Sequence, residues 1–215
     1  MMPAALGIVV GLEAEARVAR GWGVPVVVGG GGAAGAARAV EVLAGRVSGL
    51  ISFGLAGGLA PGLRAGDLVV PRLVLDGDEA WETDLALNEK LGGGTGHVLL
   101  GGGAVLATVA AKRVAHRTAD AVDLESAAVA RAAARHGLPF AVLRAVCDTA
   151  DRALPRAALV ALDGAGRIGA LRVMAAVLRR PWEIPALLGL ARDAGRARTA
   201  LSGRVAATSL VGSVA

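Results

Sequence analysis

The chain has 215 residues, of which 54% are hydrophobic and 19% are charged, so it can bury one substantial core but is too short for two ordinary enzymatic domains. Glycine and charged residues interrupt every apolar run before it reaches about 18 residues, which excludes a transmembrane helix despite a mean hydropathy of +0.58. Residues 1–11 lack the basic start of a signal peptide. We expect one cytoplasmic domain spanning residues 1–215.

Cysteine, histidine and aromatic content exclude several kinds of partner. The single cysteine, Cys147, excludes an internal disulfide, and the three histidines are too far apart for metal-ligand spacing. The net charge of +5 comes from residues 152–215, which hold ten arginines and three acidic residues. With no tyrosine and two phenylalanines, the chain lacks the aromatic surfaces on which nucleic-acid bases stack. We therefore expect no metal and no nucleic acid.

The first part of the chain alternates apolar runs with segments of helical composition. Residues 6–11 and 24–28 are predicted strands, and the segments EAEARVAR and AAGAARAVEVLAG that follow them are predicted helices. A third apolar run spans residues 49–57. Strands without polar alternation, separated by helices, indicate a largely parallel sheet covered on both faces. The predicted class is α/β.

The middle of the chain is less regular. The run DLVVP at 67–71 is a predicted strand, whereas residues 72–103 are first acidic and then glycine-rich, and we predict a loop excursion there. Order returns with a predicted helix, ESAAVARAAARHG, and a predicted strand at 138–146. In the tail, Pro181 separates two amphipathic helices predicted at about 168–180 and 182–200.

Acidic and glycine residues follow the predicted strands, where ligands of open α/β sheets gather. The four positions are Glu13 and Glu15, the turn SFGLAGG, Asp123 and Glu125, and Asp148 and Asp151. Carboxylates accept hydrogen bonds from hydroxyl groups, and a protonated one can donate to a leaving group. We expect these acids to converge on one pocket, although Glu13 and Asp123 also suit purely structural roles as a first-turn acid and a helix cap.

Three blocks of sequence resemble the superfamily of purine nucleoside phosphorylases and methylthioadenosine/adenosylhomocysteine nucleosidases. They are GIVVGLEAEA at 7–16, SFGLAGGLAPGLRAGDLVVP at 52–71, and AVDLESAAVARAAARHGLPFAVLRAVCDTAD at 121–151, the longest and most specific. The segment between Asp67 and Asp123 is shorter than in typical nucleosidases. The resemblance implies a three-layer α/β sandwich with a mixed, largely parallel central sheet.

The same resemblance implies roles for individual residues. Asp148 would protonate the purine, for which burial or a neighbouring carboxylate must raise its pKa, and Glu15 would activate water. Glu125 would hold the ribose diol. The remaining residues expected at the substrate are Leu124, Asp123, Gly54 and Gly57.

Either phosphate or water could attack the sugar carbon and accept the sugar. Leu55 stands where the family has a serine that fixes phosphate or water, and Ser52 stands where hexameric phosphorylases have an arginine. Backbone amides around Gly30, Gly32 and Leu55 could still form an anion nest. We expect phosphorolysis with orthophosphate as co-substrate and no cofactor, with hydrolysis as the alternative because Glu15 is retained.

The segments RALPRAALVALDGAG and RRPWEIPALLGLARDA resemble a narrower branch, the hopanoid-associated phosphorylases. That resemblance implies adenine release from adenosylhopane in hopanoid lipid biosynthesis. Arg179, Arg180 and Trp182 could rest on an anionic membrane surface at the inner face, against the simpler alternative of two packed closing helices. The superfamily also implies a homo-oligomer.

Two other classes of function each fit part of the sequence. Gly30, Gly32 and Gly35 match the glycine pattern of dinucleotide-binding oxidoreductases, but the end of the next predicted strand lacks the acid that would bind a ribose. A non-enzymatic lipid carrier would fit the apolar composition and the basic tail. It would leave Glu125 and Asp148 unexplained.

Overall fold

The computed structural model describes residues 5–159 and 181–210. The strands are β1 (Leu6–Val10), β2 (Val26–Val28), β3 (Gly49–Gly58), β4 (Leu68–Val69), β5 (Leu73–Asp76), β6 (Glu79–Glu82), β7 (Val98–Leu100), β8 (Ala121–Val122) and β9 (Phe140–Asp148). The helices are α1 (Glu13–Ala19), α2 (Ala33–Leu43), α3 (Leu85–Lys90), α4 (Val109–Ala115), α5 (Ser126–Arg135), α6 (Arg156–Leu159) and α8 (Ile184–Ala207).

These strands form one mixed sheet in which parallel pairs predominate. The order is β2-β1-β3-β8-β7-β5-β6, and β9 lies beside β3 and β4. Strands β1, β2, β3 and β9 run parallel, while β8 meets the end of β3 antiparallel. The parallel strands therefore deliver their carboxyl ends, and the residues that follow them, to the same edge of the sheet.

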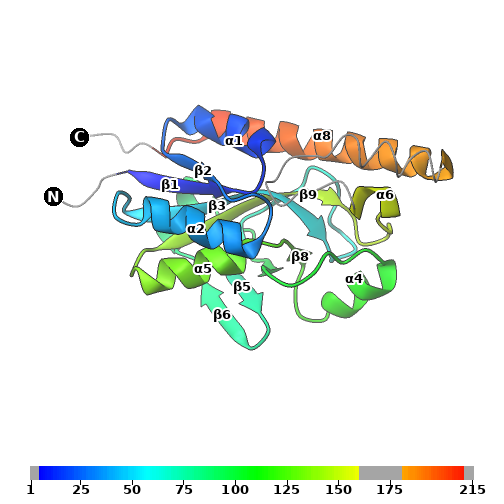
Figure 1. The fold of residues 1–215 in the computed structure, drawn as a ribbon, viewed down its shortest axis with the longest axis horizontal. Coiled ribbons are helices and arrows are strands. Elements are labelled where there is room, and N and C mark those ends of the chain that lie inside the picture. The colour runs from blue at the N-terminus through cyan, green and yellow to red at the C-terminus, as the bar shows by residue number, and fades with distance from the viewer. Residues whose placement is uncertain (1–4, 160–180, 211–215) are drawn as a thin grey trace.

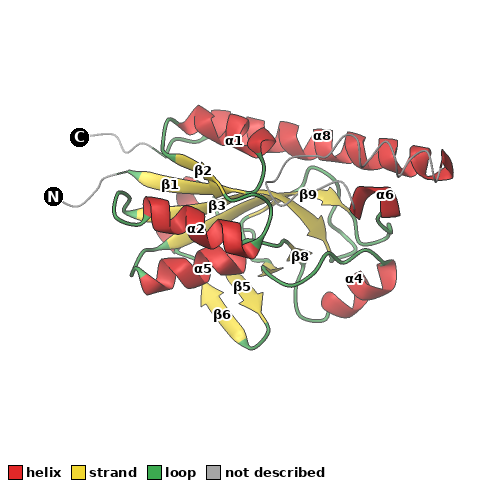
Figure 2. Ribbon diagram, viewed as in Figure 1, coloured by secondary structure: helices red, strands yellow, loops and turns green. Residues whose placement is uncertain are grey.

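Helices cover both faces of the sheet, as Figures 1 and 2 show. On one face, apolar residues of α2 and α5 pack with the strands in a core that includes Val40 and Val129. On the other, α1 and α8 pack against Phe53 and Leu143. Both cores are built mainly from alanine, valine and leucine. The predicted three-layer α/β class is thus confirmed.

Element predictions succeeded where an apolar run is strong and failed where it is short. The strands predicted at 6–11, 24–28, 49–57 and 138–146 are present as β1, β2, β3 and β9. The loop predicted at 72–103 is wrong, because this segment contains β5, β6, α3 and β7. Each of these elements has only three to six residues and is partly exposed, so its apolar run is too short to stand out from the acidic and glycine-rich sequence around it.

The described part of the tail is a single long helix. Residues 181–183 form a turn of 3-10 helix, and α8 continues to Ala207, beyond the predicted end at residue 200. It is buried at Asp193, Ala197, Leu201 and Val205. The helix predicted at 168–180 lies outside the described residues. Within the described residues, no helix is both long enough and apolar enough to cross a membrane.

Candidate active site

Four of the predicted carboxylates line one cavity at the carboxyl edge of the sheet. The cavity has a volume of about 340 Å³, and its walls include Glu15, Asp123, Glu125 and Asp148. All four are buried, with exposures of 4% to 7%. Glu13 and Asp151, by contrast, do not line it. Glu13 is paired with Arg20 on the surface, and Asp151 accepts a hydrogen bond from Thr149.

Glu15 is fixed by the backbone at the start of α1. Its Oε2 accepts hydrogen bonds from the amides of Gly11 and Leu12, at 3.0 and 2.8 Å, and its Oε1 accepts one from the amide of Leu55 at 2.9 Å. Burial raises the pKa of Glu15, against the opposing charge of Arg144 and these three amides. The carboxylate is therefore held in one orientation between the ends of β1 and β3.

Arg144 of β9 lies at the centre of the acidic cluster and is 1% exposed. Its Nη2 is 2.5 Å from Asp123 Oδ2 and 3.3 Å from Glu125 Oε2. It also donates to the hydroxyls of Ser52 and Ser126 at 2.7 and 3.1 Å. One buried cation thus faces several buried carboxylates. Its Nε is buried without a hydrogen-bond partner among the described residues.

Glu125 has a strongly raised pKa. Burial raises its pKa to about 7, against the lowering effect of Arg144, and the nearby charges of Glu15 and Asp123 raise it further. It stands immediately before α5. Gly11 lets it come this close, because a Cβ at residue 11 would collide with the carboxylate of Glu125. Glu125 therefore changes charge near neutral pH.

Asp123 has a different task, since the protein occupies both of its carboxylate oxygens. Oδ1 accepts a hydrogen bond from the amide of Ser126 at 3.2 Å, and Oδ2 accepts one from the Ser126 hydroxyl at 2.5 Å. Together with Arg144, these contacts anchor the beginning of α5. Asp123 thus lines the cavity and also organises the segment that presents Leu124 and Glu125.

Asp148 ends β9 beside Gly57 of β3, because the pairing of the two strands shifts register between Ala56 and Gly57. Burial raises its pKa, and the ammonium group of Lys112 opposes that rise. Lys112 Nζ lies 2.6 Å from Asp148 Oδ2. The neighbouring Cys147 also lines the cavity, and burial raises the pKa of its thiol to about 12, so it is not a thiolate.

The glycine positions divide into those at the cavity and those beside it. Gly57 and Leu55 line the cavity together with Gly31, whereas Gly30 and Gly32 are not among its lining residues. Gly54 has a φ of +156° and lies against Glu15 and Arg144. The expected phosphate contacts of Gly30, Gly32 and Leu55 remain predictions, and of these three residues only Leu55 is in the cavity wall.

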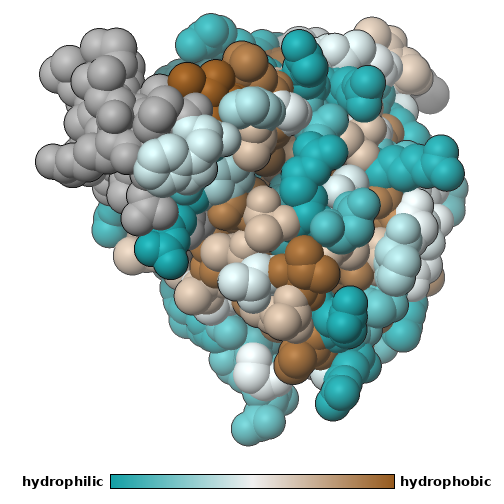
Figure 3. Space-filling model, turned by 90° about the vertical axis from the view of Figure 1, so that its right-hand side faces the viewer, coloured by the Kyte–Doolittle hydropathy of each residue, from teal (hydrophilic) through white to brown (hydrophobic). Residues whose placement is uncertain are grey.

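Beyond the carboxylates the cavity is apolar. Its walls there are formed by Leu12, Val105, Leu106, Leu154, Leu190 and Ala194. Several of these come from the loop before α4 and from α8. The end of the molecule that carries α4, α6 and the start of α8 faces the viewer in Figure 3, where hydrophobic side chains gather amid hydrophilic ones. The site thus combines a charged floor with an apolar wall.

Two residues of the site, Arg144 and Lys112, were not predicted from the sequence. Arg144 lies within an apolar strand, LPFAVLRAV, and a charged residue in a run predicted to be buried was the signal that could have found it. Lys112 had no such signal, because the sequence around it reads as an ordinary exposed helix. Within the described residues, no group of three or more His, Cys, Asp or Glu side chains could hold a metal ion.

Comparison with known proteins agrees with this architecture. The family model described as the phosphorylase superfamily matches residues 85–180. A methylthioadenosine/adenosylhomocysteine nucleosidase from Neisseria meningitidis, in complex with methylthio-immucillin-A, has a similar fold, with a TM-score of 0.65 and 18% identity over 95% of this chain and 99% of that one. Among curated proteins, no sequence matches this chain.

Two further solved structures have the same fold. An adenosylhomocysteine nucleosidase from Streptococcus pyogenes, in complex with 5-methylthiotubericidin, gives a TM-score of 0.65 and 19% identity over 95% of this chain and 97% of that one. A futalosine hydrolase mutant from Helicobacter pylori gives 0.56 and 20% over 66% and 88%. The fold is that of the nucleoside phosphorylases and nucleosidases, and the match of residues 85–180 to the phosphorylase superfamily agrees with the superfamily predicted from the sequence.

Proposed function

We propose that this chain cleaves the N-glycosidic bond of a 5′-substituted purine nucleoside and releases the purine base. The observation that carries the proposal is the convergence of Glu15, Glu125 and Asp148, all buried, on one cavity with an apolar wall. The nucleosidase fold supports it, because the structures similar to this chain include enzymes named for methylthioadenosine and adenosylhomocysteine.

Cleavage requires a proton for the base, a hydrogen-bond acceptor for the ribose hydroxyls and a negative charge near the sugar. As the glycosidic bond breaks, the sugar becomes positively charged and the base negatively charged. Asp148, whose pKa burial raises, gives a proton to the purine, and such general acid catalysis contributes roughly 10² to 10⁴ in rate. Ionised Glu125 accepts hydrogen bonds from the two ribose hydroxyls and stabilises the positive sugar.

The charges of the cavity favour water over phosphate as the attacking group. Of the described residues that line it, Arg144 is the only cation, and it is already engaged by Asp123 and Glu125. A phosphate dianion would meet the carboxylates of Glu15, Asp123 and Glu125 with little compensation, whereas Glu15 could take a proton from water. Hydrolysis is therefore the form of the reaction that the geometry supports best, and orthophosphate is the competing acceptor.

The apolar wall suits a hydrophobic group on the 5′ carbon. Leu154, Leu190 and Ala194 contribute to it, and a triterpenoid substituent, as in adenosylhopane, would lie against this wall. Another side of α8 carries the exposed apolar side chains of Ile184 and Leu188, and Trp182 is exposed just before the helix. That exposed side, with Arg192 and Arg196, would then rest on an anionic membrane.

The test is base release by the purified protein in phosphate-free buffer and again with added phosphate. Methylthioadenosine and adenosylhopane are compared as substrates, with Asp148→Asn as the inactive reference. Phosphate-independent release of adenine supports a hydrolase, and strict dependence on phosphate would replace it with a phosphorylase. No release from either nucleoside contradicts the proposal.

The membrane contact is tested separately, by co-sedimentation of the protein with lipid vesicles. Binding to anionic but not to neutral vesicles supports the contact, and equal binding to both contradicts it.

A further inference from the structure

The strongest feature that the proposed chemistry does not yet use is the buried lysine of α4. Lys112 is 1% exposed, and all three of its ammonium hydrogens have acceptors. They are Asp148 Oδ2 at 2.6 Å and the carbonyl oxygens of Thr149 and Arg152, both at 2.8 Å. A buried ammonium group is costly unless it is fully paired, so this arrangement is specific.

The pairing makes the two oxygens of Asp148 unequal. Oδ2 accepts the hydrogen bond from Lys112, whereas Oδ1 is buried and has no hydrogen-bond partner among the described residues. A proton on Oδ2 would have to displace the ammonium group. The carboxyl proton therefore belongs on Oδ1, the oxygen that the protein leaves without a partner.

We propose that Lys112 is a positioning residue for Asp148, which reserves Oδ1 for the transferable proton and stabilises the carboxylate that remains after the proton has left. This inference rests on the proposed cleavage reaction. It adds a residue from α4, outside the three sequence blocks that carry the family resemblance.

The electron pair of the bond between the sugar carbon and the base passes to the purine, and the proton of Asp148 Oδ1 passes to a ring nitrogen. Asp148 becomes a carboxylate whose charge faces Lys112 at 2.6 Å. The water oxygen bonds to the sugar carbon, and its proton goes to Glu15. Since the charge on Asp148 appears only as the bond breaks, Lys112 acts on the transition state more than on the bound substrate.

The other charged groups near Asp148 have different partners from Lys112. Arg152 and Asp151 lie on the loop after β9, and Arg152 is paired with Asp193 of α8 at 2.5 Å. Cys147 precedes Asp148 as a neutral thiol. Lys112 also joins two walls of the cavity, because it binds the loop after β9 while α4 follows the segment containing Val105 and Leu106.

The test compares Lys112→Met with wild type on two substrates. One is a purine nucleoside, which needs protonation of its leaving group, and the other is 4-nitrophenyl β-ribofuranoside, which does not. We expect kcat/KM for the purine nucleoside to fall roughly 10- to 100-fold, which is part of the roughly 10²- to 10⁴-fold that general acid catalysis contributes, with a change below about threefold for the nitrophenyl riboside. Without Lys112 the pKa of Asp148 rises, so the alkaline limb of the pH profile moves to higher pH.

The matched control is Lys90→Met, because Lys90 is the second of the two lysines in the chain and is exposed at the end of α3. It should leave both substrates and the pH profile unchanged. Equal losses of Lys112→Met on both substrates with an unmoved alkaline limb would reveal a merely structural role and overturn the proposal. So would full activity on the purine nucleoside.

A measurement independent of turnover separates this inference from the proposed function. With only two lysines, the 15N signal of the Lys112 ammonium group is readily assigned in the wild-type protein. It should shift as Asp148 titrates and lose that shift in Asp148→Asn, while the Lys90 signal stays constant. If wild type releases no purine but this titration is present, the proposed function fails and the pairing stands. If the titration is absent, the inference fails whatever the activity.

Discussion

The carboxylate of Glu15 and the guanidinium of Arg144 approach each other across Gly54, with no room for a side chain between them. A Cβ on Gly54 would collide with Glu15 Oε1 and with Arg144 Nη1. Gly54 pairs with Arg144 in the register of β3 and β9, so the two strands bring the charges together at this point. The glycine-rich end of β3 is thus what allows helix α1 and strand β9 to share one site.

The first prediction concerns Gly54→Ala. The new methyl group would push apart Glu15 and Arg144, and its φ of +156° is unfavourable for alanine, so we expect a loss of about 2 to 4 kcal/mol in the free energy of unfolding. Urea denaturation measures it. Gly62→Ala is the control, because Gly62 has open space around its Cα, and it should change stability by less than about 0.5 kcal/mol. Equal stability of the two variants would contradict the described contact.

The second prediction follows from the pKa of Glu125, which burial raises to about 7. Below about pH 4.5 the residue is protonated in both folded and unfolded states, so wild type and Glu125→Gln should respond to pH alike. Between about pH 4.5 and 7 the unfolded chain releases this proton and the folded chain keeps it. Wild type should therefore lose stability relative to Glu125→Gln as pH rises, by up to about 3 kcal/mol, and remain lower above pH 7.

Urea unfolding of both proteins at intervals from pH 4 to 8 measures this difference. Glu13→Gln is the control, because Glu13 is half-exposed and its only described pairing is with Arg20 at 3.7 Å. It should show no such trend. A difference between wild type and Glu125→Gln that stays constant from pH 4 to 8 would show that Glu125 titrates normally in the folded protein.

The third prediction concerns Arg144→Met. Removal of the cation leaves Asp123 and Glu125 buried without their partner, and we expect a loss of about 3 to 5 kcal/mol at pH 8. The loss should shrink at pH 5, where Glu125 is protonated in the folded state. Base release should also be lost. The measurements are urea denaturation at both pH values and an assay of the folded fraction.

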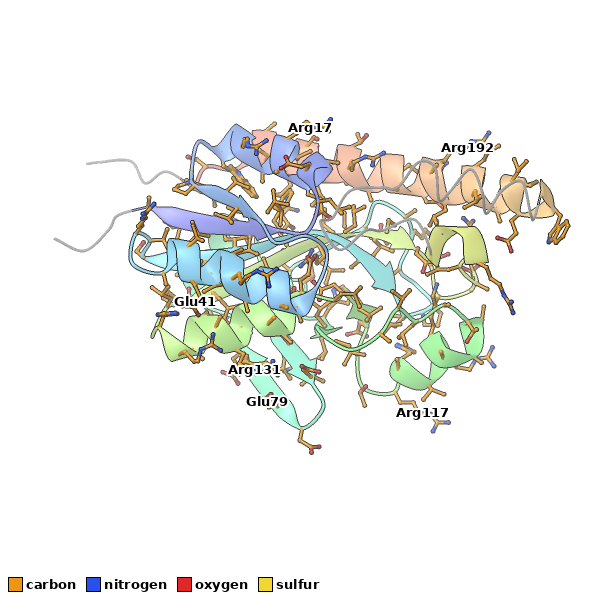
Figure 4. All side chains as sticks on the ribbon, in the orientation of Figure 1. Arg17, Glu41, Glu79, Arg117, Arg131 and Arg192 are labelled. Atoms are coloured by element: carbon orange, nitrogen blue, oxygen red, sulfur yellow. The ribbon has the colours of Figure 1, made fainter. Side chains whose placement is uncertain are left out.

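Arg131→Met serves as its control. Arg131 pairs with Glu79 and Asp76 on the surface, and Figure 4 shows Arg131 and Glu79 close together beside α5. It is also 5.1 Å from the centre of the Trp81 ring. Because exposed ion pairs contribute little, this variant should lose about 1 kcal/mol or less. A similar loss in both variants would mean that Arg144 is not balancing buried charge.

Sequence patterns predicted the parts of this protein that are set locally. The apolar runs fixed β1, β3 and β9, and the acids that follow them were expected at one edge because parallel strands end together. Figure 4 also shows why charge alone was a poor guide, since many charged side chains, Arg17 and Arg192 among them, project from the surface. Glu15 and Glu13 differ only in which side of α1 they occupy.

The pairings of Lys112 and Arg144 could not be predicted from the sequence, because they depend on contacts between distant segments. The pair of Lys112 and Asp148 joins residues 36 positions apart, and Arg144 reaches Ser52 over 92 positions. Neither pairing has a local signature, because it depends on how α4 and β3 pack against β9. The proposed preference for water over phosphate likewise rests on the charges that face the cavity, which come from residues distant in the sequence.

The last prediction concerns the apolar wall. Ala194 of α8 lines the cavity, so Ala194→Phe should narrow the space for a 5′ substituent while leaving the carboxylates in place. We expect kcat/KM to fall roughly tenfold or more for a nucleoside with a long apolar 5′ group, and by less than about threefold for unsubstituted adenosine, since steric crowding in an apolar pocket costs about 1 to 3 kcal/mol. Ala191→Phe, exposed on the same helix, is the control and should leave the ratio of the two substrates unchanged. Equal losses on both nucleosides would place the purine or the ribose, not the 5′ group, against α8.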